Sequence, residues 1–184
     1  MKNSGRFPLA FATATFLAAF AAAQDFPGTK KPSVTLQPPE IISIVRGQSG
    51  TVPLQFRVAS GFHINSNVPK REYLKKTELK LDAPTDIMVS KITYPDGEDT
   101  SFPFAPDEKL NVYSGDFTVT VQVRPLKGVV PTKYAIHGKL DYQACDNAAC
   151  YPPKQLPISF EVKVIKGAPQ HQRRTPPQSP HTHT

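Results

Sequence analysis

Two cysteines, Cys145 and Cys150, are the residues of this chain best suited to chemistry. They stand five positions apart and enclose the four residues Asp-Asn-Ala-Ala. In an oxidising compartment, two cysteines this close are expected to pair. Facing residues of an antiparallel hairpin have Cα atoms about 4.5 to 5.5 Å apart, inside the ~4.4 to 6.8 Å range of disulfides. We therefore predict one disulfide, carried by a hairpin at the surface.

The shortness of the enclosed loop limits what this bridge does for stability. Closing a loop of about six residues removes only ~2 kcal/mol of unfolded-state entropy. This favours a bridge that a partner can reach, although an inert staple that locks a hairpin stays an alternative. A metal half-site is a third interpretation, since His171, His181 and His183 follow near the C-terminal end. Two sulfurs fall short of the usual four ligands of zinc, so we expect no metal and no cofactor.

The N-terminus predicts export. Lys2 and Arg6 give a positive start, residues 9–20 form an apolar run, and Ala21 to Ala23 offer a small-residue cleavage site. This order is typical of a secretory signal peptide over residues 1–23, cleaved after Ala23. A retained membrane anchor is the alternative, but the run is shorter than the ~20 residues that span a bilayer. We expect a periplasmic or secreted protein.

The rest of the chain divides by composition into one domain and two polar segments. Residues 24–32 and 167–184 contain few apolar side chains and are predicted to be disordered. Residues 33–166 suit a single domain. The formal net charge is +7, and basic residues come at most in adjacent pairs, such as Arg173-Arg174. We therefore expect neither nucleic acid nor a membrane as partner, and a monomer.

Apolar residues in the predicted domain alternate with a period of two, which is typical of half-buried antiparallel strands. Prolines are frequent, at 20 in the chain, and no helical period stands out. The sequence predicts an all-β, immunoglobulin-like β-sandwich of about seven to nine antiparallel strands. The expected strands cover residues 41–45, 52–58, 79–81, 87–94, 117–123, 134–142 and 156–164.

The cysteines lie within a specific motif, Tyr-Gln-x-Cys followed by Cys-x-Pro-Pro, which spans residues 142–153. It resembles the active-site hairpin of the N-terminal periplasmic domain of the DsbD thiol:disulfide interchange proteins. Three other segments match that family in order, over residues 61–65, 94–97 and 112–115. The resemblance covers roughly residues 34–165.

The resemblance implies that the cysteine pair passes electrons by thiol–disulfide exchange. By analogy with the family, Cys150 forms the mixed disulfide with a partner and Cys145 resolves it. The implied partner is a thioredoxin-fold periplasmic oxidoreductase or a membrane-bound DsbD-like reductase. Tyr142 and Tyr151, which flank the pair in the motif, are further candidate site residues.

The resemblance also implies a cap loop that shields the disulfide with an aromatic ring. The segment Gly97–Lys109 stands where this loop is expected, with Phe102 and Phe104 as the candidate rings; simple core filling is the alternative. In enterobacterial members the strand beside the pair carries tyrosines where this chain has His63 and Asn65. We place these two beside the disulfide, although a strand histidine is more often structural than catalytic.

Asp146, next to Cys145 in the chain, disfavours a second negative charge and is expected to keep that thiol protonated. The pair is then a relay whose reactivity a partner tunes. Two features depart from the family. The loop between the cysteines is one residue shorter than in the enterobacterial form. The domain is also expected to be free-standing, so it has to obtain electrons from another polypeptide. The rival functions are a non-catalytic binding module with a structural disulfide and a metal-handling protein that uses the His-rich tail.

Overall fold

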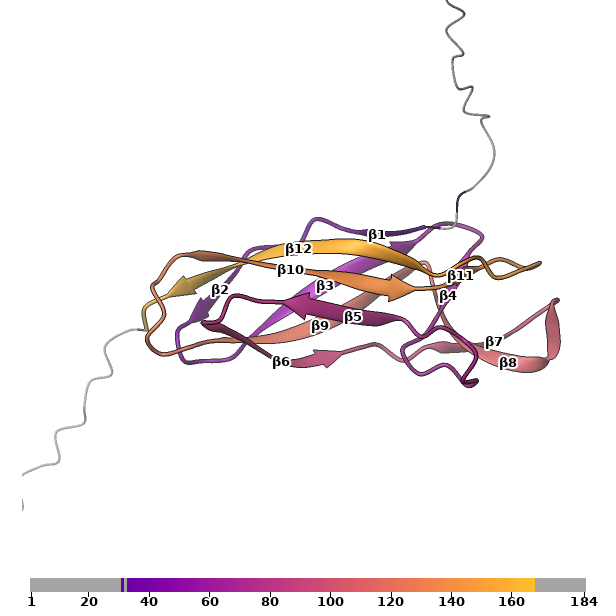
Figure 1. Ribbon diagram of the computed structural model, residues 1–184, viewed down its shortest axis with the longest axis horizontal. Helices are drawn as coiled ribbons and strands as arrows, with labels where there is room; N and C mark the ends of the chain where they lie inside the picture. The colour runs from indigo at the N-terminus through magenta and orange to yellow at the C-terminus, as the bar shows by residue number, and fades with distance from the viewer. Residues whose placement is uncertain (1–30, 32, 168–184) are drawn as a thin grey trace, which may run out of the picture.

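The computed structural model describes residues 31 and 33–167 and shows strands without helices among them (Figure 1). Most strands are short, and four of them reach ten residues or more. In chain order the strands are β1 (Val34–Leu36), β2 (Ile42–Val45), β3 (Gly50–Val58), β4 (His63–Asn65), β5 (Glu78–Asp82), β6 (Ile87–Thr93), β7 (Glu98–Phe102), β8 (Ala105–Ser114), β9 (Asp116–Pro125), β10 (Lys133–Tyr142), β11 (Ala144–Cys145) and β12 (Lys154–Ile165).

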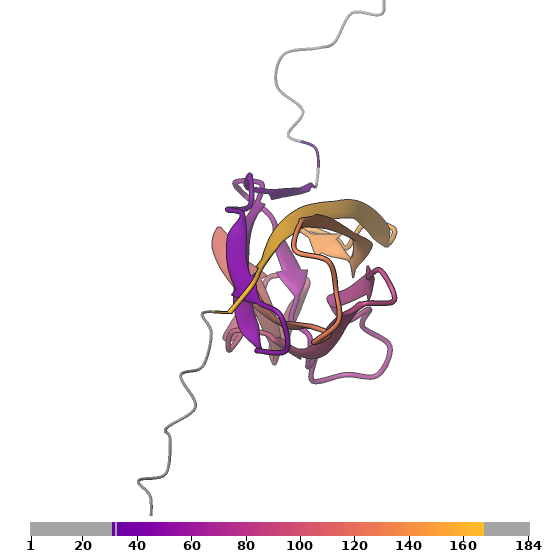
Figure 2. The ribbon, with the colours of Figure 1, turned by 90° about the vertical axis from the view of Figure 1, so that its left-hand side faces the viewer.

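Two four-stranded sheets form the body of the molecule, with strand orders β1-β3-β9-β6 and β2-β12-β10-β5. Burial alternates along β3, β9 and β12, so that every second side chain points between the sheets. One cluster of apolar side chains draws on both sheets, including Leu54, Val121, Ile136 and Val162, none of them exposed. Each such burial stabilises the fold by about 1.5 to 3 kcal/mol. The end-on view in Figure 2 shows the two layers wrapped around this core.

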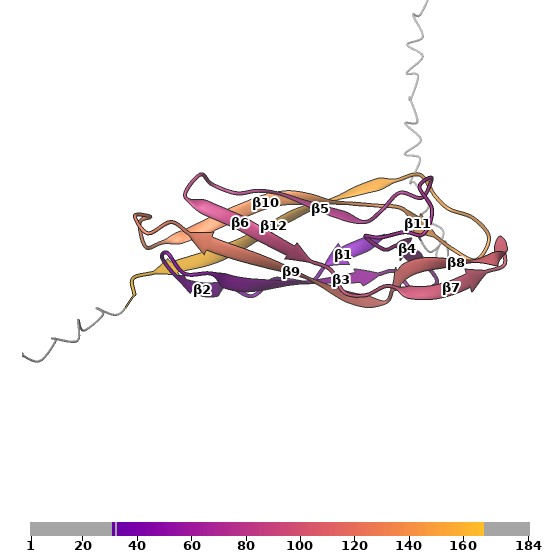
Figure 3. The same ribbon diagram turned by 90° about the horizontal axis from the view of Figure 1, so that it is seen from below.

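A third sheet, with strand order β11-β4-β8-β7, lies at one end of the sandwich (Figures 1 and 3). The chain enters it from both layers: β3 leads into β4, β10 leads into β11, and β8 leads back into β9. Two of these corners use glycine in the left-handed region, Gly61 at φ 87° and Gly115 at φ 62°. Glycine adopts this conformation without the steric cost that other residues carry. This end sheet holds both the cysteine hairpin and the predicted cap.

The predicted all-β, immunoglobulin-like sandwich is confirmed. The seven strands expected from the alternation are all present, and the five further strands include four of the end sheet. One pairing is parallel, between β2 and β12, whereas we expected antiparallel strands throughout. The part of the chain that the structure describes contains no helix long and apolar enough to span a membrane. The predicted signal peptide lies outside the described residues, as do residues 168–184 of the predicted disordered tail and all but residue 31 of the predicted N-terminal segment.

Candidate functional site

The cysteines sit on an extension of the long β10–β12 hairpin. Beyond the last ladder pair, the Tyr151 N–H donates to the Ala144 carbonyl at 2.9 Å, and the Asp146 N–H donates to the Ala149 carbonyl at 2.9 Å. Cys145 and Cys150 face each other between these bonds and form the predicted disulfide. Their Cα atoms are 3.9 Å apart, closer than we expected from regular hairpin geometry.

The two sulfur-bearing residues differ in exposure. Cys145, on β11, is fully buried, and Cys150 is exposed. β11 is the edge strand of the end sheet, and Cys150 lies on its outer side, where it pairs with Cys145 alone. The exposed Pro152 and Pro153 follow; proline has no N–H and cannot extend a ladder. An approaching protein therefore meets Cys150 first.

The Asp146 carboxylate organises the loop between the cysteines. Its Oδ1 accepts the N–H groups of Ala148 and Ala149 at 2.8 and 2.9 Å, an Asx turn. Its Oδ2 accepts the hydroxyl of Tyr151 at 2.6 Å. The Tyr151 hydrogen bond, aided by these two N–H groups, lowers the pKa of Asp146, and the same carboxylate raises the pKa of Tyr151. A fixed negative charge thus stands next to Cys145.

Gln143, the second residue of the motif, ties the hairpin to its surroundings. Its Nε2 donates to the Tyr151 carbonyl at 3.1 Å. Its Oε1 accepts the Lys75 N–H at 3.3 Å and the Asn65 amide at 3.4 Å. Asn65 is fully buried, and its Nδ2 also donates to the Lys75 carbonyl at 3.0 Å. The Gln143 side chain therefore holds three separate segments together. The motif alone does not indicate this role of Gln143.

Cys145 lies directly across from His63 in the β11–β4 ladder, and Ala144 lies across from Ile64. Ala144 and Ile64 point into the main core. Because successive side chains alternate between faces, Cys145 and His63 share the opposite face of the end sheet. Directly opposed residues of antiparallel strands have Cβ atoms about 4.5 to 5.5 Å apart. The predicted position of His63 beside the disulfide is therefore present in the structure.

Three rings stack in near-parallel planes on this face. The His63 ring lies on the Phe102 ring at a centroid distance of 3.8 Å and an interplanar angle of 13°. Phe104 lies 5.6 Å from Phe102 and 6.4 Å from His63. His63 is 3 % exposed, and its Nε2 has no hydrogen-bond partner among the described residues. Burial lowers the pKa of His63 to about 4, against an opposing attraction from Asp146.

The predicted cap segment is a β-hairpin, formed by β7 and β8, and not an irregular loop. The ladder shifts register between Ser101 and Phe102; such irregularities re-aim side chains. Phe102 is buried at 8 % exposure in a small cluster with Leu110 and Val112, whereas Phe104 is exposed at 36 %. Phe102 therefore fills a local core, as our alternative held, and also stacks on His63. Its role as a shield stays a prediction.

Ion pairs connect this hairpin to the segment between β4 and β5. Arg71 forms a two-pronged contact with Glu108, at 2.9 and 3.3 Å, and the Tyr73 hydroxyl donates to the same carboxylate. Lys70 pairs with Asp99 on β7. All these groups are at least partly exposed. These ion pairs therefore add contacts that water and salt can weaken to the β4–β8 ladder, which also holds the hairpin.

The remaining predicted site residues divide between the site and the core. Tyr151 lies at the site, where its ring meets that of Phe62 edge-on at 5.8 Å. Tyr142 instead packs in the main core at 4 % exposure, and its hydroxyl accepts the Val34 N–H. Among the described residues, no group of three or more His, Cys, Asp or Glu side chains is placed to hold a metal ion. The histidines of the C-terminal segment lie outside the described residues.

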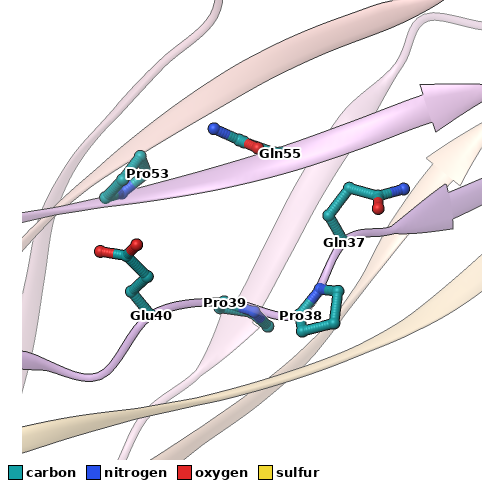
Figure 4. A pocket seen from close by; sticks show the side chains of 6 residues that line it. All are labelled: Gln37, Pro38, Pro39, Glu40, Pro53 and Gln55. Carbon is teal, nitrogen blue, oxygen red and sulfur yellow. The ribbon is translucent and has the colours of Figure 1, made fainter.

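A hollow on the body of the sandwich lies between β3 and the segment that links β1 to β2 (Figure 4). Glu40 is its one ionisable side chain, and neither cysteine lines it. The residues around it are Gln37, Pro38, Pro39, Glu40, Pro53 and Gln55. No sulfur or imidazole group lines this hollow, and the cysteine hairpin is the candidate functional site.

Comparison with known proteins identifies the family of this chain. The sequence profile described as "Thiol:disulfide interchange protein DsbD, N-terminal" matches residues 33–161. The chain belongs to the DsbD N-terminal domain family. Thiol:disulfide interchange, through a domain that meets thioredoxin-like partners, is thus its general activity, and the DsbD N-terminal domain is a periplasmic domain. A search of curated proteins found no match.

Two solved structures are among those that resemble this chain. The DsbD N-terminal domain of Neisseria meningitidis in its reduced form is 24% identical, with a TM-score of 0.41, over 68% of this chain and 84% of that one. The seventh ScaB type I cohesin of Pseudobacteroides cellulosolvens is 10% identical, with a TM-score of 0.44, over 82% of this chain and 98% of that one.

Proposed function

We propose that this domain is an electron relay in which Cys150 exchanges with a thioredoxin-fold partner and Cys145 resolves the mixed disulfide. The observation that carries the proposal is the difference in exposure between the bonded cysteines, one fully buried and the other open to solvent. Exchange requires a thiolate to approach one sulfur in line with the disulfide, so access decides which sulfur is attacked. Cys150 is the sulfur that a partner can reach.

The chemistry that follows is a balanced two-step exchange. A partner thiolate attacks the Cys150 sulfur, the Cys145–Cys150 bond breaks, and Cys145 leaves as a thiolate that takes up a proton. The second thiol of the same partner then attacks the partner's own sulfur in the mixed disulfide. Cys150 leaves, the domain is reduced, and the partner is oxidised. Run in reverse, the same steps deliver two electrons from the domain. The fixed charge of Asp146 disfavours the Cys145 thiolate and so keeps this thiol protonated in the reduced protein.

We further propose that the β7–β8 hairpin is the cap of this site and that Phe104 is its movable ring. Phe104 is half-exposed and stands at the tip of the hairpin, next to the ring stack on His63. The hairpin joins the fold through the β4–β8 ladder at Val112 to Ser114, and its outer part, residues 98–110, is held by exposed ion pairs, which contribute little each, and by one small apolar cluster. We propose that this outer part lifts while the ladder and the main core stay in place.

Export by a signal peptide cleaved after Ala23 completes the proposal, because the pair needs an oxidising compartment that also holds thioredoxin-fold proteins. The physiological partner is then an exported thioredoxin-fold oxidoreductase or a membrane-bound DsbD-like reductase. The domain acts as a monomer, and neither nucleic acid nor a metal takes part.

Redox equilibration of the folded protein tests the proposed function. A relay pair should reach equilibrium with a reduced thioredoxin-fold protein within minutes, in buffer without denaturant, as read by alkylation of free thiols. An inert staple in a binding module would remain oxidised until the protein unfolds. Reduction that requires denaturant would therefore overturn the proposal in favour of the binding module.

A further inference from the structure

His63 is a buried polar side chain whose surroundings do not explain it. It is 3 % exposed, its Nε2 is buried without a hydrogen-bond partner among the described residues, and an apolar ring covers one of its faces. Leaving a buried polar atom unpaired costs about 1 to 3 kcal/mol. A phenylalanine here would extend the stack without that cost. An unpaired nitrogen of this kind calls for an explanation in the chemistry of the site.

The ladder places this nitrogen-bearing ring next to the buried cysteine. His63 and Cys145 are directly opposed residues on the same face of the end sheet. In the oxidised protein Cys145 carries no proton, so His63 finds nothing there to bond. In the mixed disulfide and in the reduced protein, Cys145 carries a thiol whose proton has to leave before the sulfur can attack.

We propose that His63 is the proton acceptor for the Cys145 thiol, an inference that rests on the proposed relay function. In the resolving step the Cys145 proton passes to the imidazole, and the Cys145 thiolate attacks the Cys150 sulfur. The Cys145–Cys150 bond forms, the bond from Cys150 to the partner breaks, and the partner leaves as a thiolate with the electron pair. In the opposite direction, the imidazolium returns the proton to Cys145.

Charge around the ring fits this task. Among the described residues, Asp146 is the charged group that acts on His63, and its carboxylate favours the imidazolium. Phe102 and Phe104, on the hairpin side, carry no charge, and Ser114 is the neighbour across on β8. Asp146 therefore has two effects: it disfavours a resting thiolate on Cys145, and it stabilises the proton once His63 has taken it.

The hairpin then controls when the transfer occurs. Beneath the closed stack the ring is desolvated and stays neutral, because burial holds its pKa near 4. When the hairpin lifts for a partner, water reaches the ring and its pKa returns toward the ordinary value of about 6.5. A pKa close to the working pH makes a better general base. Docking of a partner thus makes His63 a more effective general base.

Reaction of the reduced protein with 5,5′-dithiobis(2-nitrobenzoate) tests this step, because each sulfur releases one coloured thiolate. The first release reports attack by Cys150, and the second reports the resolving attack by Cys145. In the wild-type protein the second release should be fast at pH 6 to 7. In His63→Gln it should slow by about tenfold or more, and its pH profile should move to that of an unassisted thiol beside Asp146, above about pH 8.5. The exposed His137 on β10 provides the matched control, His137→Gln, with both releases unchanged.

The two phases separate this inference from the function on which it rests. If the wild-type protein shows no fast second release, the relay itself fails. If the wild-type protein shows both phases and His63→Gln matches it across the pH range, the relay stands and His63 takes no proton. A purely structural role would slow both phases equally at every pH and lower the melting temperature, and that result would also overturn the proposal.

Discussion

The hydroxyl of Tyr151 donates a 2.6 Å hydrogen bond to the carboxylate of Asp146, across the loop that the disulfide closes. This bond orients a charged group that also caps two backbone N–H groups of the loop. Asp146 therefore combines a structural and an electrostatic role, and a substitution can separate them.

Replacing Asp146 with Asn should keep the turn and remove the charge. The amide oxygen can still accept the N–H groups of Ala148 and Ala149, so the hairpin should fold. Without the carboxylate, the pKa of the Cys145 thiol in the reduced protein should fall. Thiolate absorbance at 240 nm, titrated in a variant that lacks Cys150, measures this pKa. Glu161→Gln, which removes an exposed carboxylate paired with Lys133 on the body of the sandwich, is the control and should leave it unchanged. An unchanged pKa in Asp146→Asn would remove Asp146 from the account.

Phe102 and Phe104 should respond differently to truncation. Phe104→Ala removes a half-exposed ring and should speed reduction of the disulfide by a small thiol, with little change in stability. Phe102→Ala empties a buried position. It should also speed reduction, and it should lower the free energy of unfolding by about 3 kcal/mol. Reduction rates with dithiothreitol and urea unfolding measure the two effects. If Phe104→Ala leaves the reduction rate unchanged, this ring shields nothing.

Weakening the ion pairs should loosen the hairpin. Arg71→Ala removes both contacts to Glu108 and should raise the rate of reduction by a neutral thiol. Added salt should raise the wild-type rate and affect the variant less, because screening acts on the same contact. The loss in stability should stay within about 1 kcal/mol. Lys133→Ala, which breaks the comparable exposed pair with Glu161 on the sandwich body, is the control. Equal rates in all three proteins would contradict a cap held by these pairs.

Stability should depend on pH through His63. Its pKa is about 4 in the folded protein and about 6.5 when unfolded. Between about pH 4 and 6.5 the unfolded chain therefore binds a proton that the folded protein does not, and the free energy of unfolding should fall as the pH drops through this range. At about 1.4 kcal/mol for each unit of pKa difference, the full loss is on the order of 3 kcal/mol.

Urea unfolding at several pH values measures this effect. The difference between wild-type and His63→Gln proteins isolates it from carboxylates that titrate over the same range. Parallel curves for the two proteins would show that His63 is not desolvated.

The sequence predicted the sandwich because the body of the fold obeys a simple rule. Along β3, β9, β10 and β12, alternate side chains face one core, and a period of two reveals this directly. The cap hairpin follows no such rule. β7 consists of polar residues ending in Phe102, and it is held by ion pairs to a segment that precedes it by about 30 residues. Contacts of this kind leave no periodic signal.

The site was predictable where its chemistry requires a particular residue type. It was less predictable where tertiary packing determines which side chains meet. Cysteine spacing predicted the disulfide. The burial of His63 depends on Phe102 returning over it after a register shift, which no local pattern indicates. The role of Gln143 depends on Lys75, 68 residues earlier. Tyr142 shares the motif but faces the core because of its place in the β10 alternation.

Trapping with single-cysteine variants tests the central claim, the different roles of the two cysteines, most directly. Each variant is mixed with a thioredoxin-fold protein from which the resolving cysteine has been removed. The remaining cysteine of that protein carries an activated disulfide. Cys145→Ser keeps the exposed Cys150 and should form a mixed disulfide readily, seen as a shifted band on a non-reducing gel. Cys150→Ser keeps only the buried Cys145 and should form it at least tenfold more slowly, because access limits attack. Equal trapping by both variants, or faster trapping through Cys145, would contradict the account.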